Sequence, residues 1–479
     1  MKLTSFYLPD IFNGHYNTGA IEINCIETSY FDNADNIKIA AHELKDSFFT
    51  EGLPHFYKNA AAILDSLKIK DIIDTLDCVS RQFLNPDDSD RKTAIEAIRC
   101  ITGFSRESAA KSIELEFSSS LKPEMTAAII NEFGSLEILD EFVSNAGNDR
   151  RSRALPAGSV FAVSSSNIPA LPHLSIMRAF LTKNPVVVKT SFDEPIFTPL
   201  YMQAFRRIKS PLSECAAAVC YKSGENAEYT DKFIDWANVI IAYGGIEAEK
   251  YFADRIKYPK KLIMHPHRLG FGIIARGALK DKTPAQLDEL AHAIAADTAT
   301  FDQRACLAPH IYFYCVEDNE NITDFIARLM HAFEYYEQKL PPATLSGTDN
   351  FLRRTFLDSL NFEKNVTDIY ETISKKSAVI EITPSKFPLS PLNRVLFIAR
   401  FHKAEEVLNI IKPLGKYLQN AALCVKKENE IFWFNALSKL SVSRICAPGE
   451  MPAPTMIWRH DGIGALIEMT KFCDIEKYY

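Results

Sequence analysis

The sequence predicts an α/β protein with parallel sheets that are covered by helices on both faces. From Val160 onward, short apolar runs alternate with stretches that have the apolar spacing of helices. These runs lack the polar alternation of half-exposed strands, which is typical of strands buried on both faces. Before that point, a long stretch has helical spacing, which predicts a helical N-terminal part.

Length and composition narrow the classes of protein to consider. The chain has 479 residues, which suits two or three domains. Its formal net charge is -7 and its basic residues are dispersed, which argues against nucleic acid as a partner. No apolar run reaches the length of a membrane span, and the N-terminus is too polar for a signal peptide. The ten cysteines form no C-x-x-C pair, so we expect no metal site and no disulfide framework, and a cytoplasmic location.

The N-terminal part precedes the alternating pattern. Residues 1–35 are expected to form strand and loop, and residues 36–145 are expected to be helical. The clearest helical runs are Ala60–Leu67 and Ala94–Ile101. Asn145–Arg153 is polar and contains a glycine, so it is expected to be a connector.

A first parallel sheet follows. Its four expected strands are Val160–Val163, Pro185–Lys189, Cys215–Tyr221 and Val239–Tyr243, and the helices between them are Leu171–Leu181, Phe197–Ile208 and Thr230–Trp236. Gly244–Gly245 ends the fourth strand, and a helix begins near Glu247. A junction of this type directs backbone N–H groups at an anion, although the G-x-G-x-x-G fingerprint is absent.

A second α/β segment is expected from about Lys261. Its elements are the apolar run Leu269–Ile274, the helix Thr283–Ala299, the strands His310–Val316 and Val395–Ile398, and the helix Ala404–Leu414. Residues 317–390 have no clear pattern.

Cys306 is the residue whose position most clearly suggests a catalytic role. It stands in the sequence Phe-Asp-Gln-Arg-Ala-Cys, in the short connection between the helix and the strand of this second segment. Connections carry catalytic groups more often than core elements do. A thiolate there could attack an acyl carbon. The alternative is that Cys306 is a small buried hydrophobic residue, as most free cysteines are.

Polar residues and glycines occur along the chain in a distinctive order. Asn167 follows the first strand, Lys189 ends the second, Gly244–Gly245 ends the fourth, and Cys306 comes last. This order and spacing resemble the aldehyde dehydrogenase superfamily and, within it, the bioluminescence-type fatty acyl-CoA reductases, the LuxC-like family. Further segments that resemble this branch are Ile101–Ser105, Leu181–Asn184 and Trp458–Gly462.

The resemblance implies an aldehyde-dehydrogenase-like fold. Residues 1–265 would be a Rossmann-type cofactor-binding domain that includes the helical N-terminal part. Residues 266–440 would be an α/β catalytic domain that carries the nucleophilic cysteine. Residues 441–479 would pack at a domain or subunit surface, in a homo-oligomer.

The resemblance also assigns roles to residues. Cys306 would be the nucleophile, and Asn167 would donate its amide N–H to the developing oxyanion, an interaction typically worth about 3–4 kcal/mol. The residues that would bind the cofactor are Ser164, Ser166, Lys189, Ser191, Gly244 and Gly245. Structural alternatives remain open, since Asn167 could be a turn residue, Lys189 a solvated strand end and the glycines a plain turn.

Three departures from the superfamily bear on the cofactor and the reaction. Phe192 stands where many NAD-preferring members have an acidic residue that repels a 2′-phosphate, which favours NADPH, although Asp193 is adjacent. The segment His265–Gly272 has no carboxylate where aldehyde-oxidising members carry the glutamate that activates water. A second glutamate, near Ser390–Val395, is also missing. His265, His267 and His310 flank the site in sequence and are expected to be structural.

The sequence therefore predicts an NADPH-dependent reductase that converts an acyl thioester to an aldehyde through an acyl-cysteine intermediate. The acyl donor would be acyl-CoA or an acylated partner protein of the acyl-protein synthetase or acyltransferase type. One alternative is a CoA-acylating or hydrolytic aldehyde dehydrogenase that works in the oxidative direction. Another is a non-catalytic acyl-binding subunit.

Overall fold

The computed structural model describes residues 3–24, 36–144, 150–316 and 322–476. The chain divides into two compact units, which are described separately. The first unit contains Met1–Thr102, Ile113–Pro266 and Thr455–Tyr479, and the second contains Gly103–Ser112 and His267–Pro454. Residues 441–454 therefore lie in the second unit, and the remaining C-terminal residues return to the first unit.

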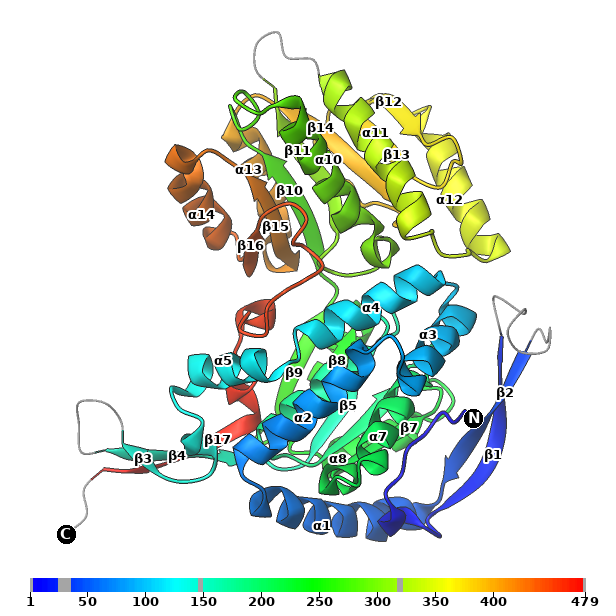
Figure 1. Ribbon diagram of the computed structural model, residues 1–479, viewed down its shortest axis with the longest axis vertical. Helices are drawn as coiled ribbons and strands as arrows, with labels where there is room; N and C mark the ends of the chain where they lie inside the picture. The colour runs from blue at the N-terminus through cyan, green and yellow to red at the C-terminus, as the bar shows by residue number, and fades with distance from the viewer. Residues whose placement is uncertain (1–2, 25–35, 145–149, 317–321, 477–479) are drawn as a thin grey trace. The chain divides into compact units, whose positions relative to one another are not determined.

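The first unit is built on a five-stranded parallel sheet (Figure 1). Its strands are β5 (Val160–Val163), β6 (Val186–Thr190), β7 (Ala216–Cys220), β8 (Val239–Gly244) and β9 (Lys261–Pro266), in the order β7-β6-β5-β8-β9. The four expected strands are confirmed. The expectation that a second α/β segment begins at Lys261 is wrong, because β9 pairs in parallel with β8 in the first sheet.

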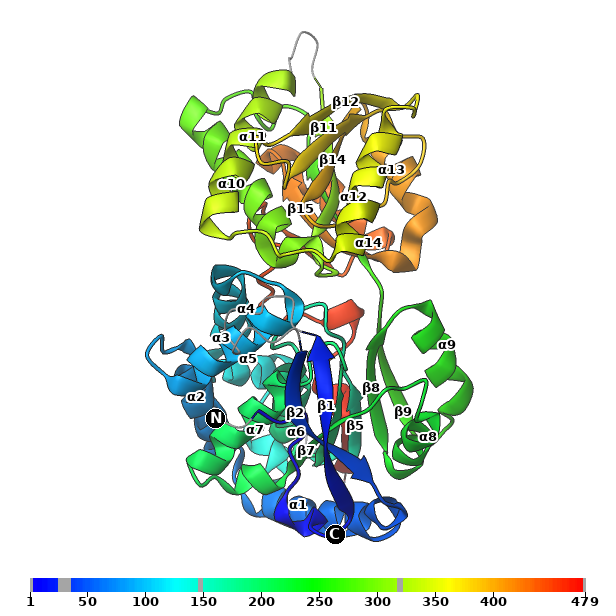
Figure 2. The ribbon, with the colours of Figure 1, turned by 90° about the vertical axis from the view of Figure 1, so that its right-hand side faces the viewer.

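Helices cover both faces of this sheet (Figure 2). Right-handed crossovers place α6 (Pro172–Leu181) and α7 (Phe197–Arg207) on one face, and α8 (Ala227–Trp236) and α9 (Ile246–Arg255) on the other. The N-terminal helices are α1 (Leu53–Ser66), α2 (Ile69–Leu84), α3 (Ser89–Thr102), α4 (Arg106–Ser118) and α5 (Lys122–Phe133). The helical N-terminal part is therefore confirmed for these residues.

Two expectations for the N-terminal part are wrong. Residues 36–44 are not helical but form β2 (Asn36–Leu44), which pairs with β1 (Tyr16–Asn24). The start of β2 alternates polar and apolar residues with period two, which is a strand pattern. The expected connector at residues 145–153 lies partly outside the described residues, and from Arg151 onward it is the strand β4 (Arg151–Pro156). This strand pairs with β3 (Val143–Ser144) and with β17 (Thr470–Ile475), which is far away in sequence.

The second unit has a seven-stranded sheet. Its strands are β10 (Leu269–Ile274), β11 (Pro309–Cys315), β12 (Val366–Glu371), β13 (Ala378–Ile382), β14 (Val395–Phe401), β15 (Leu418–Cys424) and β16 (Arg444–Cys446). They lie in the order β12-β13-β14-β11-β10-β15-β16, and β12 is antiparallel to β13 while the other pairs are parallel. The stretch 317–390, in which the sequence shows no clear pattern, thus contributes β12 and β13 together with α11 (Ile322–Lys339) and α12 (Gly347–Leu360).

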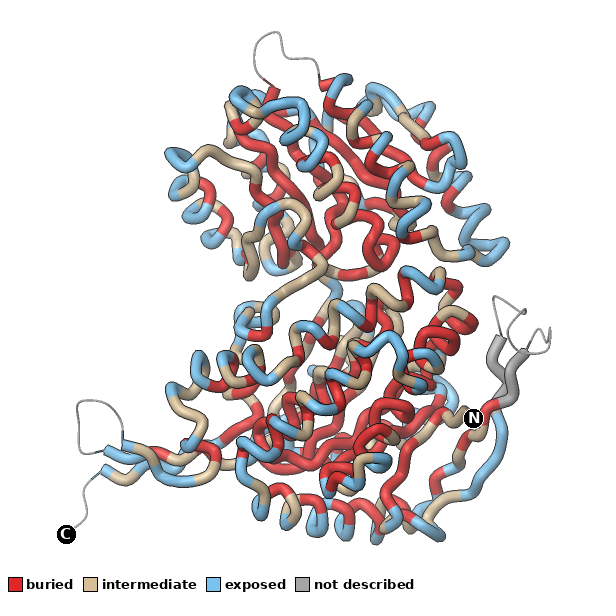
Figure 3. Tube along the Cα trace, in the orientation of Figure 1, coloured by how far each residue is buried: buried red, intermediate tan, exposed pale blue. Residues whose placement is uncertain are grey.

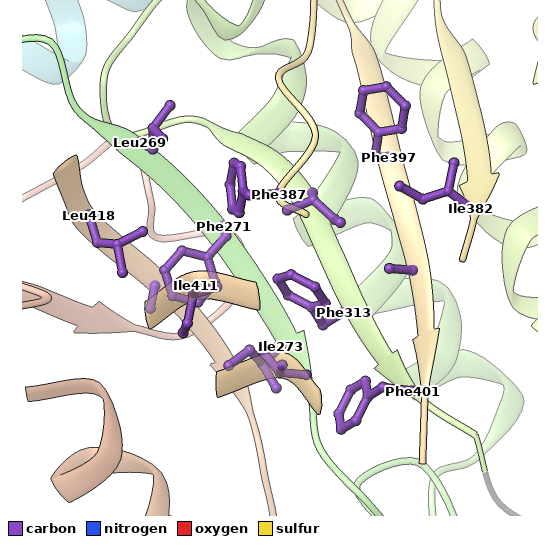
Figure 4. Close-up of a cluster of buried hydrophobic side chains, with 14 of the residues drawn as sticks. Leu269, Phe271, Ile273, Phe313, Ile382, Phe387, Phe397, Phe401, Ile411 and Leu418 are labelled. Atoms are coloured by element: carbon purple, nitrogen blue, oxygen red, sulfur yellow. The ribbon is translucent and has the colours of Figure 1, made fainter. Parts of the chain in front are cut away.

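Successive side chains of the central strands point to opposite faces of the second sheet. Phe271, Ile273 and Phe313 pack on one face against α12, α13 (Ala404–Ile411) and α14 (Glu430–Lys439) (Figure 4). Tyr312 and Tyr314 pack on the other face against α10 (Pro284–Ala299) and α11. In each unit the central sheet strands consist largely of buried residues (Figure 3). The sheet cores therefore hold the connecting loops in place.

Two further findings concern the cysteines and the length of the apolar helices. Among the residues that the structure describes, eight cysteines are outside disulfide bonds, whereas Cys100 is disulfide-bonded, a bond that the scattered cysteine spacing did not indicate. Among the described residues, no helix is long and apolar enough to span a membrane.

Candidate active site

The loop that carries Cys306 is held between a capped helix and a buried strand. α10 begins after Thr283, whose side chain forms a capping box with Gln286. A short 3-10 segment, Thr300–Gln303, follows α10, and β11 starts at Pro309. Cys306 lies between them and is partly exposed. The expected helix–strand connection is confirmed, and the thiol is not a fully buried hydrophobic group.

Two short segments of the second unit, one of which precedes Cys306, have strained backbone conformations. Phe301, Asp302 and Gln303 have φ values of 54°, 48° and 62°. In the second unit, the segment Leu392–Arg394 has φ values of 65°, 52° and 63°. Each non-glycine residue in this left-handed region costs on the order of 1–3 kcal/mol and persists only where its surroundings fix it. Other interactions must therefore hold both segments.

A buried ion pair joins the two strained segments. Arg394 is 0% exposed, and its Nε donates to Asp302 Oδ1 at 2.6 Å. Its Nη2 donates to the carbonyl oxygen of Leu340 at 2.6 Å. The other carboxylate oxygen, Asp302 Oδ2, accepts from the backbone N–H of Ala343 at 2.8 Å. We call this set the Arg394–Asp302 clamp. It was not predicted, because nothing local to either residue indicates its partner.

Gln303 ties the same loop to two strands of the sheet. Its Nε2 donates to the carbonyl oxygens of Pro309 and Val395, at 2.9 and 3.1 Å. Its Oε1 accepts from the backbone N–H of Val395 at 2.8 Å. On the other side of the thiol, Asn420 Nδ2 donates to the Leu307 carbonyl at 3.0 Å. The residues around Cys306 are thus anchored to β11, β14 and β15, which fixes the thiol's position.

His310 follows the thiol in sequence but is a structural residue. It is buried, and its Nδ1 accepts from the backbone N–H of Ser390 at 3.1 Å. Burial lowers the pKa of His310 to about 4, and His267 acts in the same direction. The imidazole is therefore neutral, and the bond from Ser390 fixes its orientation at the start of β11. His267 itself is exposed.

In the first unit, Asn167 lies in the loop after β5. Ser165 Oγ donates to Asn167 Oδ1 at 2.6 Å, which orients the Asn167 amide. Ser164 anchors the start of the same loop, because its Oγ donates to the Lys189 carbonyl at 3.0 Å. Ser166, between them, is partly buried. The amide N–H₂ of Asn167 is the end of the side chain that can donate to an oxyanion.

Lys189 is the penultimate residue of the neighbouring strand β6 and is 6% exposed. Its Nζ lies over the ring of Tyr221, 4.9 Å from the centroid. Burial lowers the pKa of Lys189, and Cys220 and Asp193 act in the opposite direction. Ser191 follows, and its Oγ accepts from the Asp193 backbone N–H at 3.3 Å. Lys189 is thus a buried cation at a strand end rather than a solvated side chain.

Gly244 and Gly245 mark the junction between β8 and α9. A Cβ at Gly244 would lie 2.6 Å from Ala248 Cβ, so the strand and the helix approach too closely for a side chain there. Gly245 precedes the first residue of α9, and a Cβ on it would meet no heavy atom within 4 Å. The open space beside the helix N-terminus can accept an anionic group.

These first-unit residues share one edge of the sheet. Asn167, Lys189 and Gly244 follow or end β5, β6 and β8, which are parallel, so they lie at the carboxyl ends of adjacent strands. The strand order diverges at β5, with β6 on one side and β8 on the other. Ligands of open α/β sheets bind at such a point. Cys306 belongs to the second unit.

Sequence reasoning missed one pair in the first unit. His265 Nδ1 lies 2.8 Å from Asp461 Oδ2, and both side chains are buried. Residues 265–272 themselves contain no carboxylate, as the sequence indicated, but Asp461 supplies one from far along the chain. In the sequence, the segment Trp458–Gly462 stands out only by its resemblance to one branch of the superfamily. The adjacent His460 and Asp461 within it are the one local sign of a polar site there.

Comparison with known proteins identifies the family. The profile described as "Acyl-CoA reductase (LuxC)" matches residues 64–472, which is most of the chain. The chain belongs to this family. A long-chain acyl-protein thioester reductase from Aliivibrio fischeri is 24% identical over 86% of this chain and 83% of its own. A protein of the same name from Vibrio harveyi is 23% identical over 99% of this chain and 94% of its own.

Solved structures show the fold. An oxidoreductase from Marinobacter aquaeolei matches with a TM-score of 0.73 and 12% identity, over 99% of this chain and 98% of its own. An aldehyde dehydrogenase from Brucella melitensis biovar abortus 2308 matches with a TM-score of 0.71 and 12% identity, over 95% of this chain and 93% of its own. This LuxC-family protein therefore has the aldehyde dehydrogenase fold, as the sequence predicted.

We predict that Arg394→Met destabilises the protein by about 3–5 kcal/mol, because it leaves the Asp302 carboxylate buried without its partner. The double variant Arg394→Met/Asp302→Asn should recover part of this loss, since the neutral amide still accepts from Ala343. Calorimetric melting of both variants measures the effect. Arg354→Met, which removes a half-exposed pair with Glu371, is the control and should cost less than about 1 kcal/mol.

The clamp should also affect the rate at which the Cys306 thiol reacts. Displacing a reacting atom by about 1 Å can cost about 100-fold in rate, so both Arg394 variants should acylate Cys306 about 100-fold more slowly. Intact-protein mass spectrometry after timed exposure to acyl-CoA provides the rate. Wild-type acylation in the double variant would show that the clamp supports folding alone.

Proposed function

We propose that this LuxC-family protein reduces an acyl thioester to an aldehyde, with NADPH as hydride donor and Cys306 as the residue that carries the acyl group. The observation that carries the proposal is the partly exposed thiol of Cys306 in a strained loop that is fixed by the Arg394–Asp302 clamp. Strained, over-determined loops are typical of functional sites. The family match and the names of the relatives supply the reaction class.

The reaction has two chemical steps. The Cys306 thiolate attacks the acyl carbon of the donor, R–CO–S–R′, and the donor leaves as a thiol. Hydride then adds to the acyl carbon, and the resulting thiohemiacetal collapses to the aldehyde and the Cys306 thiolate. The balance is R–CO–S–R′ + NADPH + H⁺ → R–CHO + R′–SH + NADP⁺. Both the acyl-CoA of the family description and the long-chain acyl-protein thioester of the relatives' names fit R′–S.

The first unit would bind the cofactor, and the second would carry the nucleophile. The nicotinamide cofactor would supply the hydride when bound. Gly244 and Gly245 would face its pyrophosphate, and the buried Lys189, with Ser164, Ser166 and Ser191 nearby, would hold a ribose. Asn167 would donate to the oxyanion that develops on the acyl carbonyl.

The residues after β6 favour NADPH over NADH. Phe192, rather than a carboxylate, stands three positions after Lys189. The Nζ of Lys222 lies 5.1 Å from the centroid of the Phe192 ring, so a positive charge accompanies this position. Glu194, the next buried carboxylate along the chain, accepts instead from backbone N–H groups at the start of α7. Two carboxylates work against a 2′-phosphate here: Asp193, which is exposed, and Glu225, which pairs with Lys222 at 3.1 Å.

One observation favours a second function. The His265–Asp461 pair is a possible base for water, and a base of that kind would hydrolyse an acyl-cysteine to the acid. The protein would then be a hydrolytic aldehyde dehydrogenase. The fate of the acyl-enzyme separates the two functions.

Cys306→Ala is expected to abolish both acyl-enzyme formation and aldehyde production, because no other residue is proposed to accept the acyl group. Incubation with acyl-CoA and no NADPH should add one acyl mass to the wild-type peptide that contains Cys306. Cys424→Ala, at another partly exposed thiol, is the matched control and should retain both activities. Aldehyde formation by Cys306→Ala would disprove the mechanism.

The ratio of kcat/KM for NADPH and NADH should favour NADPH in the wild type. Phe192→Glu should shift this ratio toward NADH by about 1.5–3 kcal/mol, the range for a hydrogen bond to a charged group, because the new carboxylate repels a 2′-phosphate. Phe192→Gln, which adds polarity without charge, is the control and should change the ratio little. A wild-type preference for NADH would refute the choice of cofactor.

In the absence of NADPH, the acyl-Cys306 intermediate should decay slowly. A general base contributes about 10²–10⁴-fold, so decay by water should lie below the reductive rate by a factor of that order. The measurement is to form the acyl-enzyme, remove excess donor and follow its loss with and without NADPH. Equal rates with and without NADPH would favour the hydrolytic function.

A further inference from the structure

The residues that follow Cys306 lie against the backbone of strand β10, within the second unit. A Cβ on Gly270 would lie 2.7 Å from the carbonyl oxygen of Leu307 and 2.5 Å from that of Ala308. Both distances are shorter than an ordinary contact with a Cβ, and the oxygens belong to the backbone, so the loop itself would have to move. Gly270 is therefore the residue that lets this loop approach the sheet so closely.

The strand pairing is irregular beside this glycine. Gly270 pairs with Pro309 on β11 and with Asn420 on β15, and the register shifts next to it in both pairings. The side chains of Leu269 and Phe271 point to the face of the sheet that α12, α13 and α14 cover (Figure 4). Because successive residues of a strand face opposite sides, Gly270 faces the other side. Such irregular pairing is over-represented next to active sites, where it redirects the chain.

Asn420 holds one of the two carbonyls that lie against Gly270. It is the residue of β15 that pairs with Gly270, and its Nδ2 donates to the Leu307 carbonyl oxygen at 3.0 Å. Asn420 is 0% exposed, so its side chain does not itself contact a ligand. Any effect that it has on the thiol must therefore pass through Leu307, the residue directly after Cys306.

Arg444, on β16, determines which end of the Asn420 amide faces the loop. Its Nη1 donates to Asn420 Oδ1 at 3.3 Å and to the Met451 carbonyl oxygen at 3.0 Å. Its Nη2 donates to the Glu450 carbonyl oxygen at 2.7 Å. A guanidinium group has donors only, so the oxygen of the amide must be the end that faces Arg444. The donor end, Nδ2, is therefore directed at Leu307.

A buried carboxylate on α10 fixes the turn that holds Arg444. Asp297 Oδ1 accepts from the backbone N–H of Met451 at 3.0 Å, and its Oδ2 accepts from the backbone N–H of Gly449 at 2.7 Å. Gly449 has a φ of 93°, and a Cβ on it would lie 3.1 Å from Ala293 Cβ, so the turn packs closely on α10. The carbonyl oxygens that bind the guanidinium of Arg444 are thereby held in place.

We propose that Asn420, oriented by Arg444, is a positioning residue for the Cys306 thiol and acts through the Leu307 carbonyl. This inference rests on the proposed function, in which Cys306 accepts the acyl group. Holding the Leu307 carbonyl against Gly270 restricts rotation of the chain directly after Cys306, so the thiol keeps one direction of attack. The Arg394–Asp302 clamp fixes the residues before the thiol, and Asn420 fixes those after it.

The competing interpretation is that Asn420 only provides a partner for a buried carbonyl, as most buried polar groups require. Two observations favour positioning. The Leu307 carbonyl is confined from two sides, by Gly270 and by Asn420, and the amide that confines it is itself oriented by a buried network. A role in folding alone predicts a looser loop when the bond is lost, whereas a positioning role predicts a misdirected thiol in a loop that stays folded.

The test uses Asn420→Asp, which keeps the size of the side chain and the oxygen that faces Arg444 but replaces the donor to Leu307 with an acceptor. Acylation of Cys306 by palmitoyl-CoA without NADPH is followed by rapid quench and intact-protein mass spectrometry. The rate at saturating palmitoyl-CoA should fall about 100-fold, the cost of displacing a reacting atom by about 1 Å. The half-saturating concentration should not change, because Asn420 contacts no ligand.

A second readout separates misdirection from loosening. Alkylation of Cys306 by iodoacetamide, measured by peptide mass spectrometry against the exposed Cys78, should stay at the wild-type rate in Asn420→Asp, since the thiol keeps its exposure. Ser443→Ala is the matched control. It removes a hydrogen bond to the Gln419 carbonyl at 3.1 Å, beside Arg444 but off the path to Leu307, and should leave both rates unchanged.

Gly270→Ala tests the other side of the same carbonyl. The added Cβ should displace the Leu307 carbonyl and slow acylation as well. If both variants act through this carbonyl, the double variant Gly270→Ala/Asn420→Asp should be little slower than the slower single variant, because the two effects are not independent. This variant also decides the question if Asn420→Asp does not fold.

Three outcomes would overturn the inference. One is wild-type acylation at saturation in Asn420→Asp or in Gly270→Ala. A second is faster alkylation of Cys306 in Asn420→Asp, which would show a loosened loop and assign Asn420 to folding alone. The third is an equal loss of acylation in Ser443→Ala. The absence of an acyl mass on wild-type Cys306 would instead refute the proposed function, and the inference would fall with it.

Discussion

The geometry of the loop that carries Cys306 depends on one buried ion pair, Arg394–Asp302. Six residues in two short segments, one of which precedes Cys306, adopt left-handed backbone conformations, and such conformations do not persist without external support. The clamp joins these segments, and the bonds of Gln303 tie them to β11 and β14. A buried pair of this kind is weak support for stability, since its desolvation offsets much of its attraction. Its value here lies in placing the thiol in one position.

In the first unit, the polar groups that could bind a ligand lie at the ends of the sheet strands. Its parallel strands are buried on both faces, so function is confined to the loops at their ends. Gly244 lets α9 approach the end of β8 closely, and the space beside Gly245 leaves backbone N–H groups accessible to an anion. Lys189 is buried at the end of β6 and lies over the Tyr221 ring rather than in water. These groups are arranged along one edge because parallel strands bring their carboxyl ends together.

The choice between reduction and hydrolysis depends on the position of a carboxylate that could activate water. Residues 265–272 have none, yet Asp461 reaches the same strand end and bonds to His265. A carboxylate that contacts an imidazole sets its tautomer and favours its charged form. The neutral imidazole of this pair could accept a proton from water, which is the chemistry that the hydrolytic alternative requires.

The sequence by itself determined the α/β class, four strands of the first sheet, the helix–strand connection at Cys306 and the family, because local periodicity and short ordered motifs encode them. It did not determine β2, which precedes the residues with helical spacing and pairs with β1. Nor did it determine the sheets to which β4 and β9 belong, because these are set by pairing with β17 and β8. The Arg394–Asp302 clamp and the His265–Asp461 pair were decided only by the tertiary structure. Their partners are separated by 92 and 196 residues, and no local pattern links residues so distant. Side chains that act in pairs acquire their chemistry from the fold, since a buried charge or an oriented imidazole exists only when its partner has been brought beside it.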